Sequence, residues 1–194
     1  MTNQLIFAGM DFSSGRQPVT FAALDETLRI VVLERYEAPH VIAHLKQYGK
    51  LALAVNIPSS NSQRGLYSDV KKKLAQTSAK AAPRQFIETD AQACFRALIG
   101  KSPLPRRTLE GRVQRGLLLF DQGLRLTDPM DFFEEITRHR MLEGVFPNEL
   151  LYSASELDAL TAAYVAWLAM NEPEQLETTP QKFLILKTPE RDNE

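Results

Sequence analysis

The chain has 194 residues, of which 44% are hydrophobic and 24% are charged, a composition typical of a single globular domain. This balance excludes an intrinsically disordered or collagen-like chain. The single cysteine, Cys94, excludes an internal disulfide and a cysteine-based zinc site. No apolar run is long enough to cross a membrane and the first residues lack a signal-peptide pattern, so we expect a cytoplasmic protein without a membrane partner.

The net charge of −1 hides an uneven distribution of charge along the chain. Residues 1–59 contain 5 basic and 5 acidic residues, residues 60–115 contain 12 and 4, and residues 116–194 contain 6 and 15. The basic middle segment either faces the phosphates of a nucleic acid or pairs with the acidic last third inside one fold. The sequence alone leaves both interpretations open.

The first part of the chain is predicted to form most of a sheet. Short β-rich runs separated by turn residues predict three strands joined as a meander, over residues 4–11, 19–24 and 28–34. Apolar residues at helical spacing predict a helix over 39–48, and a continuous apolar run predicts a buried strand over 51–55.

The second part is predicted to be mainly helical. Residues 57–82 contain proline, serines and three consecutive lysines, which favour an exposed loop with a helix rather than a core segment. The remaining elements are a strand over 84–88, helices over 91–99, 109–120, 128–141 and 153–170, and a last strand over 183–186. The helix over 153–170 has a clear start, because Ser153 and Glu156 have the spacing of a capping box.

These elements define an α/β protein of one domain, residues 1–194, in which helices flank a mixed sheet of three antiparallel strands followed by parallel strands. Residues 57–82 are expected to be an exposed loop and helix insertion, and residues 101–150 a helical insertion. Asp11 and Asn56 end two strands, and Asp158 lies in the late helix. Carboxylates from separate parts of a chain are what a divalent-metal site for phosphoryl transfer requires, although polar residues at strand ends are also common in turns.

Five short motifs follow one another along the chain. They are Ala8-Gly9-Met10-Asp11 with Ser13-Ser14-Gly15, then Leu53-Ala54-Val55-Asn56-Ile57-Pro58, then Phe86-Ile87-Glu88 with residues 93–100, then residues 107–117, and finally Leu157-Asp158-Ala159-Leu160-Thr161-Ala162-Ala163-Tyr164. Each motif alone is weak, but their order resembles domain-of-unknown-function family 429, a family of predicted RNase H-like nucleases. The resemblance spans nearly the whole chain.

The resemblance implies a ribonuclease H-like fold, with Asp11 as the acid of the first strand and Asp158 as the acid of the late helix. It also implies a Mg²⁺ or Mn²⁺ ion between them, which activates a water and stabilises the charge on the phosphate. Asp11, Asn56 and Asp158 are the expected metal ligands. Asp11, Asp158 and Glu88 are the expected catalytic residues.

Two positions depart from the family pattern. Asn56 stands where the family has an acid and offers only a neutral oxygen, and Ser155 stands where related proteins often have a second helix acid. Glu88 matches an acid of the family and could compensate for Asn56. Alternatively, Glu88 simply precedes the next helix, where acids favour the helix dipole.

The basic excess includes the residues that we expect to contact nucleic acid, if they share one face: Arg64, Lys71, Lys72, Lys73, Arg106, Arg107, Arg112 and Arg115. Such contacts would bind phosphates without reading the base sequence. If these residues are dispersed, they are solubilising charges.

Three functional hypotheses follow. The first is a metal-dependent nuclease of unknown substrate, with Mg²⁺ or Mn²⁺ as cofactor. The second is a catalytically impaired RNase H-like protein that binds nucleic acid or a protein partner, which the replacements at Asn56 and Ser155 favour. The third, phosphotransfer of the actin-like kinase type, ranks last because no glycine-rich phosphate loop of that kind is visible.

Overall fold

The computed structural model describes residues 5–12, 16–48, 50–58, 60–77, 85–128, 130–131, 135–144 and 151–188. The Ser13-Ser14-Gly15 motif lies outside these residues, as do parts of both expected insertions.

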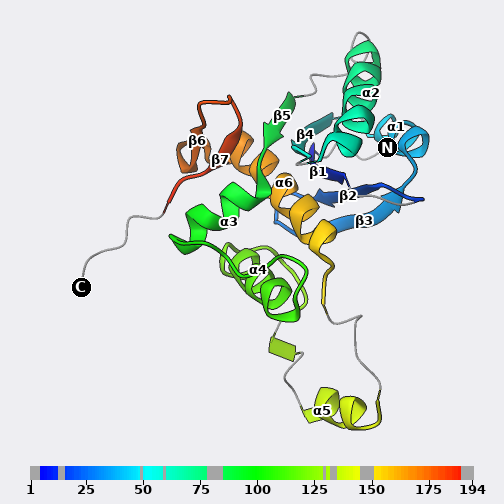
Figure 1. Cartoon of the computed structure of the whole chain (residues 1–194). Coiled ribbons are helices and arrows are strands. Elements are labelled where there is room, and N and C mark those ends of the chain that lie inside the picture. Colours follow the sequence, from blue (N-terminus) through cyan, green and yellow to red (C-terminus); the bar gives the residue numbers. More distant parts are fainter. Residues whose placement is uncertain are drawn as a thin grey trace.

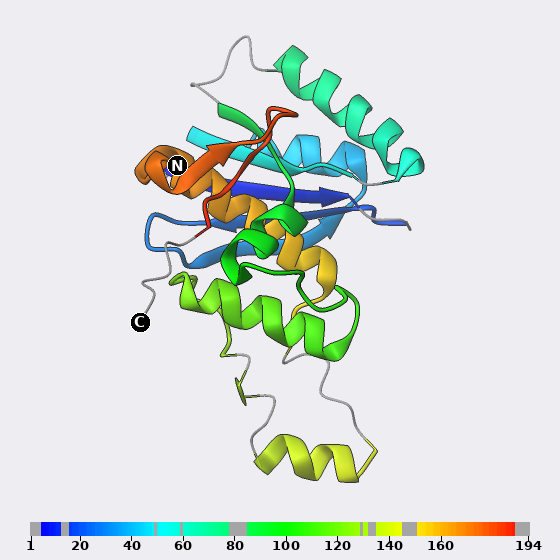
Figure 2. The same ribbon diagram turned by 60° about the vertical axis from the view of Figure 1, so that its left-hand side comes forward.

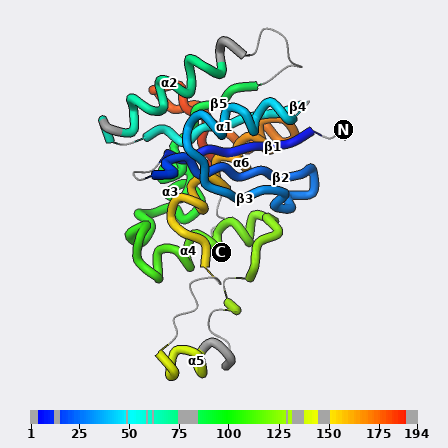
Figure 3. Tube along the Cα trace, turned by 90° about the vertical axis from the view of Figure 1, so that its right-hand side faces the viewer, coloured from blue at the N-terminus to red at the C-terminus, as the bar shows by residue number. Residues whose placement is uncertain are grey.

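A five-stranded mixed sheet organises the fold, with the strand order β3-β2-β1-β4-β5. Its strands are β1 (Leu5–Phe12), β2 (Val19–Leu24), β3 (Ile30–Tyr36), β4 (Lys50–Asn56) and β5 (Gln85–Thr89). β1, β2 and β3 pair antiparallel, whereas β4 runs parallel to both β1 and β5. Figure 3 shows β3, β2, β1 and β4 side by side. The predicted α/β class and the mixed sheet are therefore confirmed.

Helices cover both faces of this sheet, which explains why β1, β2 and β4 are buried almost throughout. α1 (Ala38–Leu45) and α2 (Asn61–Thr77) pack on one face, and α3 (Ala91–Ile99) and α6 (Ala154–Asn171) pack on the other (Figures 1 and 2). α4 (Leu109–Asp121) packs against α3 and α6. The result is two apolar cores, one on each side of the sheet.

The contact between α6 and β1 is unusually close and depends on one glycine. A Cβ atom at Gly9 would lie 2.0 Å from the carbonyl oxygen of Ala159 and 2.3 Å from the backbone nitrogen of Ala163. Only glycine allows the helix backbone to approach the strand this closely. α6 begins at the predicted capping box, in which Ser153 and Glu156 each bind the other's backbone N–H.

Helix α2 and the segment after α6 differ from the sequence prediction. α2 is not wholly exposed, because Val70 and Leu74 are buried against the sheet, where α2 packs near β1. The short strand β6 (Leu176–Thr178) was not predicted, and it pairs with β7 (Leu184–Leu186) after a 3-10 turn at Pro173–Gln175. A three-residue strand carries too little periodicity to be recognised.

The predicted helix over 128–141 corresponds in part to α5 (Glu135–Leu142), which lies away from the sheet in Figure 1. Asp128, where this helix is predicted to start, accepts a hydrogen bond from the backbone nitrogen of Met130 at 2.8 Å, as an N-cap residue does. None of the helices in the described ranges combines the length and the apolar character needed to span a membrane.

Candidate active site

Asp11 and Asp158 meet at the end of β1. Gly9 and Asp11 point to the same face of the strand, the face that α6 covers, because side chains alternate along a strand. Asp158 precedes Ala159, the residue whose carbonyl contacts Gly9. Both carboxylates are buried, with Asp11 3% and Asp158 0% exposed. The close packing of α6 on β1 therefore brings together the two acids that the sequence predicts as a pair.

Arg106 lies against both carboxylates. Its Nη2 is 2.8 Å from Oδ2 of Asp158 and 3.9 Å from Oδ2 of Asp11, and its side chain is 33% exposed. Arg106 comes from the connection between α3 and α4. The sequence predicted a phosphate contact for this arginine, but in the structure it is the counter-ion of the acid pair.

Asn56 adjoins Asp11 as predicted, but it presents a donor rather than a ligand oxygen. Its Nδ2 donates to Oδ1 of Asp11 at 2.7 Å, while its Oδ1 accepts from the backbone nitrogen of Ala91 at 2.9 Å. The N–H of Ala91 requires an acceptor, which fixes the orientation of the amide. In this arrangement Asn56 orients Asp11, and its role as a metal ligand stays a prediction.

Burial dominates the protonation of the two acids. Burial and, after it, the nearby Asp11 carboxylate raise the pKa of Asp158, Arg106 and Arg115 lower it, and the balance places this pKa at about 7. Burial also raises the pKa of Asp11, against the lowering effects of Asn56, Arg106 and Ser155. Two neighbouring carboxylates that are shielded from water repel each other when both are ionised. The Asp11–Asp158 pair therefore favours the state that keeps one proton.

The donor set fits one divalent cation. Oδ2 of Asp11 and Oδ2 of Asp158 are both buried, and neither accepts a hydrogen bond, so the Arg106 contact is one of charge alone. Two hard carboxylate oxygens that face one cationic group suit Mg²⁺ or Mn²⁺. Within the described ranges no group of three or more His, Cys, Asp or Glu side chains is placed so that it could hold a metal ion.

Glu88, the third expected catalytic residue, lies on the opposite face of the sheet. It alternates with Ile87 and Thr89, and it binds Lys71 and Tyr67 of α2. Asn56 pairs with Thr89, so Thr89 and not Glu88 shares the face of Asp11. The structure therefore does not bring Glu88 to the acid pair, and the Lys71 contact lowers its pKa.

The predicted basic residues do not form a single surface. Arg115 is 1% exposed, and it donates to the carbonyl oxygens of Leu104 and Gly111 at 2.8 and 2.9 Å. Arg112 donates to the carbonyl oxygens of Leu151 and Tyr152, both at 2.7 Å. These two arginines hold loops in place. The exposed members of the set are Arg64, Lys71, Lys72 and Lys73 on α2 and Arg107 before α4.

Gln92 is a site residue that the sequence did not indicate. Its Nε2 donates to Oδ1 of Asp158 at 3.0 Å, and its Oε1 accepts from Nη2 of Arg115 at 2.9 Å. Gln92 lies in the first turn of α3, two residues after its N-cap Asp90, and nothing in the sequence pattern marks it as a site residue. Gln92 thus connects the buried Arg115 to the acid pair.

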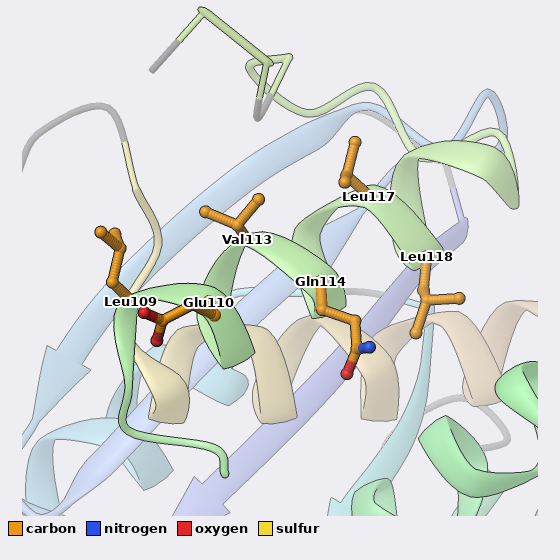
Figure 4. Close-up of a pocket in the computed structure, with 6 residues that line it drawn as sticks. All are labelled: Leu109, Glu110, Val113, Gln114, Leu117 and Leu118. Atoms are coloured by element: carbon orange, nitrogen blue, oxygen red, sulfur yellow. The ribbon is translucent and has the colours of Figure 1, made fainter. Parts of the chain in front are cut away.

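A separate hollow of about 520 Å³ lies on α4 (Figure 4). The lining residues are Leu109, Glu110, Val113, Gln114, Leu117 and Leu118. Its lining is mostly apolar and includes neither Asp11 nor Asp158, so this hollow has no part in the chemistry of the acid pair.

Comparison with known proteins adds no assignment. No protein-family model matches the chain, and none of the curated proteins matches it either.

Proposed function

We propose that the protein is a metal-dependent phosphodiester hydrolase, a nuclease with an RNase H-like fold. The observation that carries the proposal is the buried acid pair, in which Asp11 and Asp158 each direct an Oδ2 without a hydrogen bond toward one cationic group. Carboxylates from separated elements that share a cation suit phosphoryl transfer, where a metal stabilises the developing charge.

The arrangement of the sheet supports the RNase H-like assignment. Three antiparallel strands are followed by two parallel ones, in the order that the resemblance to family 429 implies. The two acids come from the first strand and the late helix, as the same resemblance implies.

In this mechanism Asp11 and Asp158 would hold a divalent cation, and such a cation, when bound, would supply activation of a water and stabilisation of the negative charge on the phosphate. Asn56 keeps Asp11 oriented through its 2.7 Å hydrogen bond, and Gln92 does the same for Asp158 at 3.0 Å. Both carboxylates must be ionised to bind the cation, so the proton held on the pair has to leave first.

Hydrolysis assays on labelled single- and double-stranded DNA and RNA oligonucleotides, with Mn²⁺ or Mg²⁺, test the proposal. We expect Asp11→Asn to lower the rate at least about 100-fold, because the variant removes a charged metal ligand. Glu88→Gln is the matched control, since it neutralises an acid on the opposite face of the sheet and should retain the parent rate. Equal rates for the parent and Asp11→Asn, or a greater loss in Glu88→Gln, would contradict the assignment.

A second function, nucleic-acid binding without hydrolysis, is favoured by Arg106 and Asn56. Arg106 neutralises the acid pair, and Asn56 supplies a donor where the family pattern has an acid. The exposed basic residues of α2 and Arg107 would then contact phosphates.

Binding through these residues should depend strongly on salt. We expect Lys72→Gln, which removes one exposed charge of α2, to weaken oligonucleotide binding and to reduce the slope of log K against log salt by about 1. Arg138→Gln, which removes an exposed charge of α5, is the control and should leave the slope unchanged. Fluorescence anisotropy at several salt concentrations, in chelator, measures both. A salt-independent affinity would rule out phosphate contacts by α2.

A further inference from the structure

The backbone on both sides of Arg106 is fixed to α4. The backbone nitrogen of Leu104 donates to Oε1 of Gln114 at 2.8 Å, and the hydroxyl of Thr108 donates to the carbonyl oxygen of Pro105 at 3.0 Å. A Cβ at Gly111 would lie 2.0 Å from that same Pro105 oxygen, so the loop and the helix are in direct backbone contact. The fixed loop aims the Arg106 side chain at the acid pair.

The guanidinium itself is held by charge rather than by hydrogen bonds. Neither Oδ2 of the acid pair accepts a hydrogen bond from it, and its own Nε is buried without a partner. One third of the side chain is exposed, so the group lies between the buried carboxylates and solvent. A contact made by charge, without directional hydrogen bonds, can be exchanged for another cation.

We propose that Arg106 is a built-in competitor of the metal: a divalent cation enters the site by displacing its guanidinium from Asp11 and Asp158. The proposal rests on the cation site of the proposed function. The distances require the exchange, because the guanidinium is 2.8 Å from one ligand oxygen and 3.9 Å from the other. Two cations at such separations repel strongly in a buried site.

Calorimetric titration with Mn²⁺ tests the exchange. We expect Arg106→Gln to bind Mn²⁺ at least about tenfold more tightly than the parent, because the metal no longer has to displace a cation that is paired with the two carboxylates. Arg107→Gln removes the same charge from the neighbouring, exposed position and should change the affinity by less than about threefold.

Arg106→Lys provides a second variant in case the glutamine variant does not fold without metal. Lysine keeps the positive charge but lacks the planar guanidinium group that can contact two carboxylates at once. The Mn²⁺ affinity of Arg106→Lys should therefore lie between those of the parent and Arg106→Gln. Equal or weaker binding by both Arg106 variants overturns the exchange but leaves the cation site standing. A lack of Mn²⁺ binding by the parent and by every variant overturns both.

Discussion

Gly9→Ala should destabilise the protein by about 3 kcal/mol and lower the Tm by about 6–12 °C. The added Cβ would lie 2.0 Å from the carbonyl oxygen of Ala159 and 2.3 Å from the nitrogen of Ala163, and both are backbone atoms that no side-chain rotation can move. α6 must therefore shift away from β1, which also separates Asp11 from Asp158. Thermal unfolding measures the loss of stability.

Gly65→Ala is the matched control for this substitution. Gly65 lies within α2, is exposed, and has no atom within 4 Å of an added Cβ. Alanine there should stabilise the protein by about 0.5–1 kcal/mol, because alanine has a higher helix propensity than glycine and its Cβ would cause no steric clash. A Gly9→Ala variant as stable as the parent would show that α6 does not pack on β1 as closely as described.

Asp158→Asn should flatten the dependence of stability on pH in metal-free protein. The folded pKa of Asp158, about 7, lies above its ordinary value, so the stabilisation it contributes at low pH is lost as the pH rises through 7. Between pH 5 and pH 8 the parent should lose about 3 kcal/mol more than the variant. Thermal unfolding in chelator across this range measures the difference.

Ionisable groups that the parent and the variant share cancel in this comparison. Glu110→Gln, which neutralises an exposed acid at the start of α4, should retain the slope of the parent. Parallel curves for the parent and Asp158→Asn would contradict the burial of an ionisable pair.

The sheet and the late helix could be predicted because their signals are local. β1 and β4 are continuous apolar runs, and α6 starts at a capping box read directly from Ser153 and Glu156. The pairing of Asp11 with Asp158 could not be predicted from local signals, because it depends on the contact of Gly9 with α6. The sequence provided that pairing only through the resemblance, which implied both acids at one site.

The basic residues show why other features could not be predicted. Arg106 and Arg107 are adjacent, yet one contacts the buried acids and the other is exposed. The backbone of Pro105 lies against Gly111 beside these two arginines, and the charge pattern of the sequence does not show which of the two points inward. Arg115 likewise resembles a surface charge in the sequence, but it is buried and donates to the carbonyl oxygens of Leu104 in the loop and Gly111 in α4.

Glu88 is the expected catalytic residue that the strand register separates from the acid pair. A shift of one residue along a strand moves a side chain to the other face of the sheet, and Thr89 occupies the face of Asp11 instead. A motif match gives the residue type and its approximate position in the strand, but it does not show on which face of the sheet the side chain lies.

Thermal unfolding of the parent and Asp11→Asn, in Mn²⁺ and in chelator, tests the central claim that the acid pair binds a cation. With Mn²⁺ about a hundredfold above its Kd, the parent should gain about 5–10 °C in Tm, because only the folded state has the site. Asp11→Asn should gain nothing, while Glu88→Gln should gain as much as the parent. An equal gain in the parent and Asp11→Asn, or no gain in the parent at millimolar Mn²⁺, would contradict the claim.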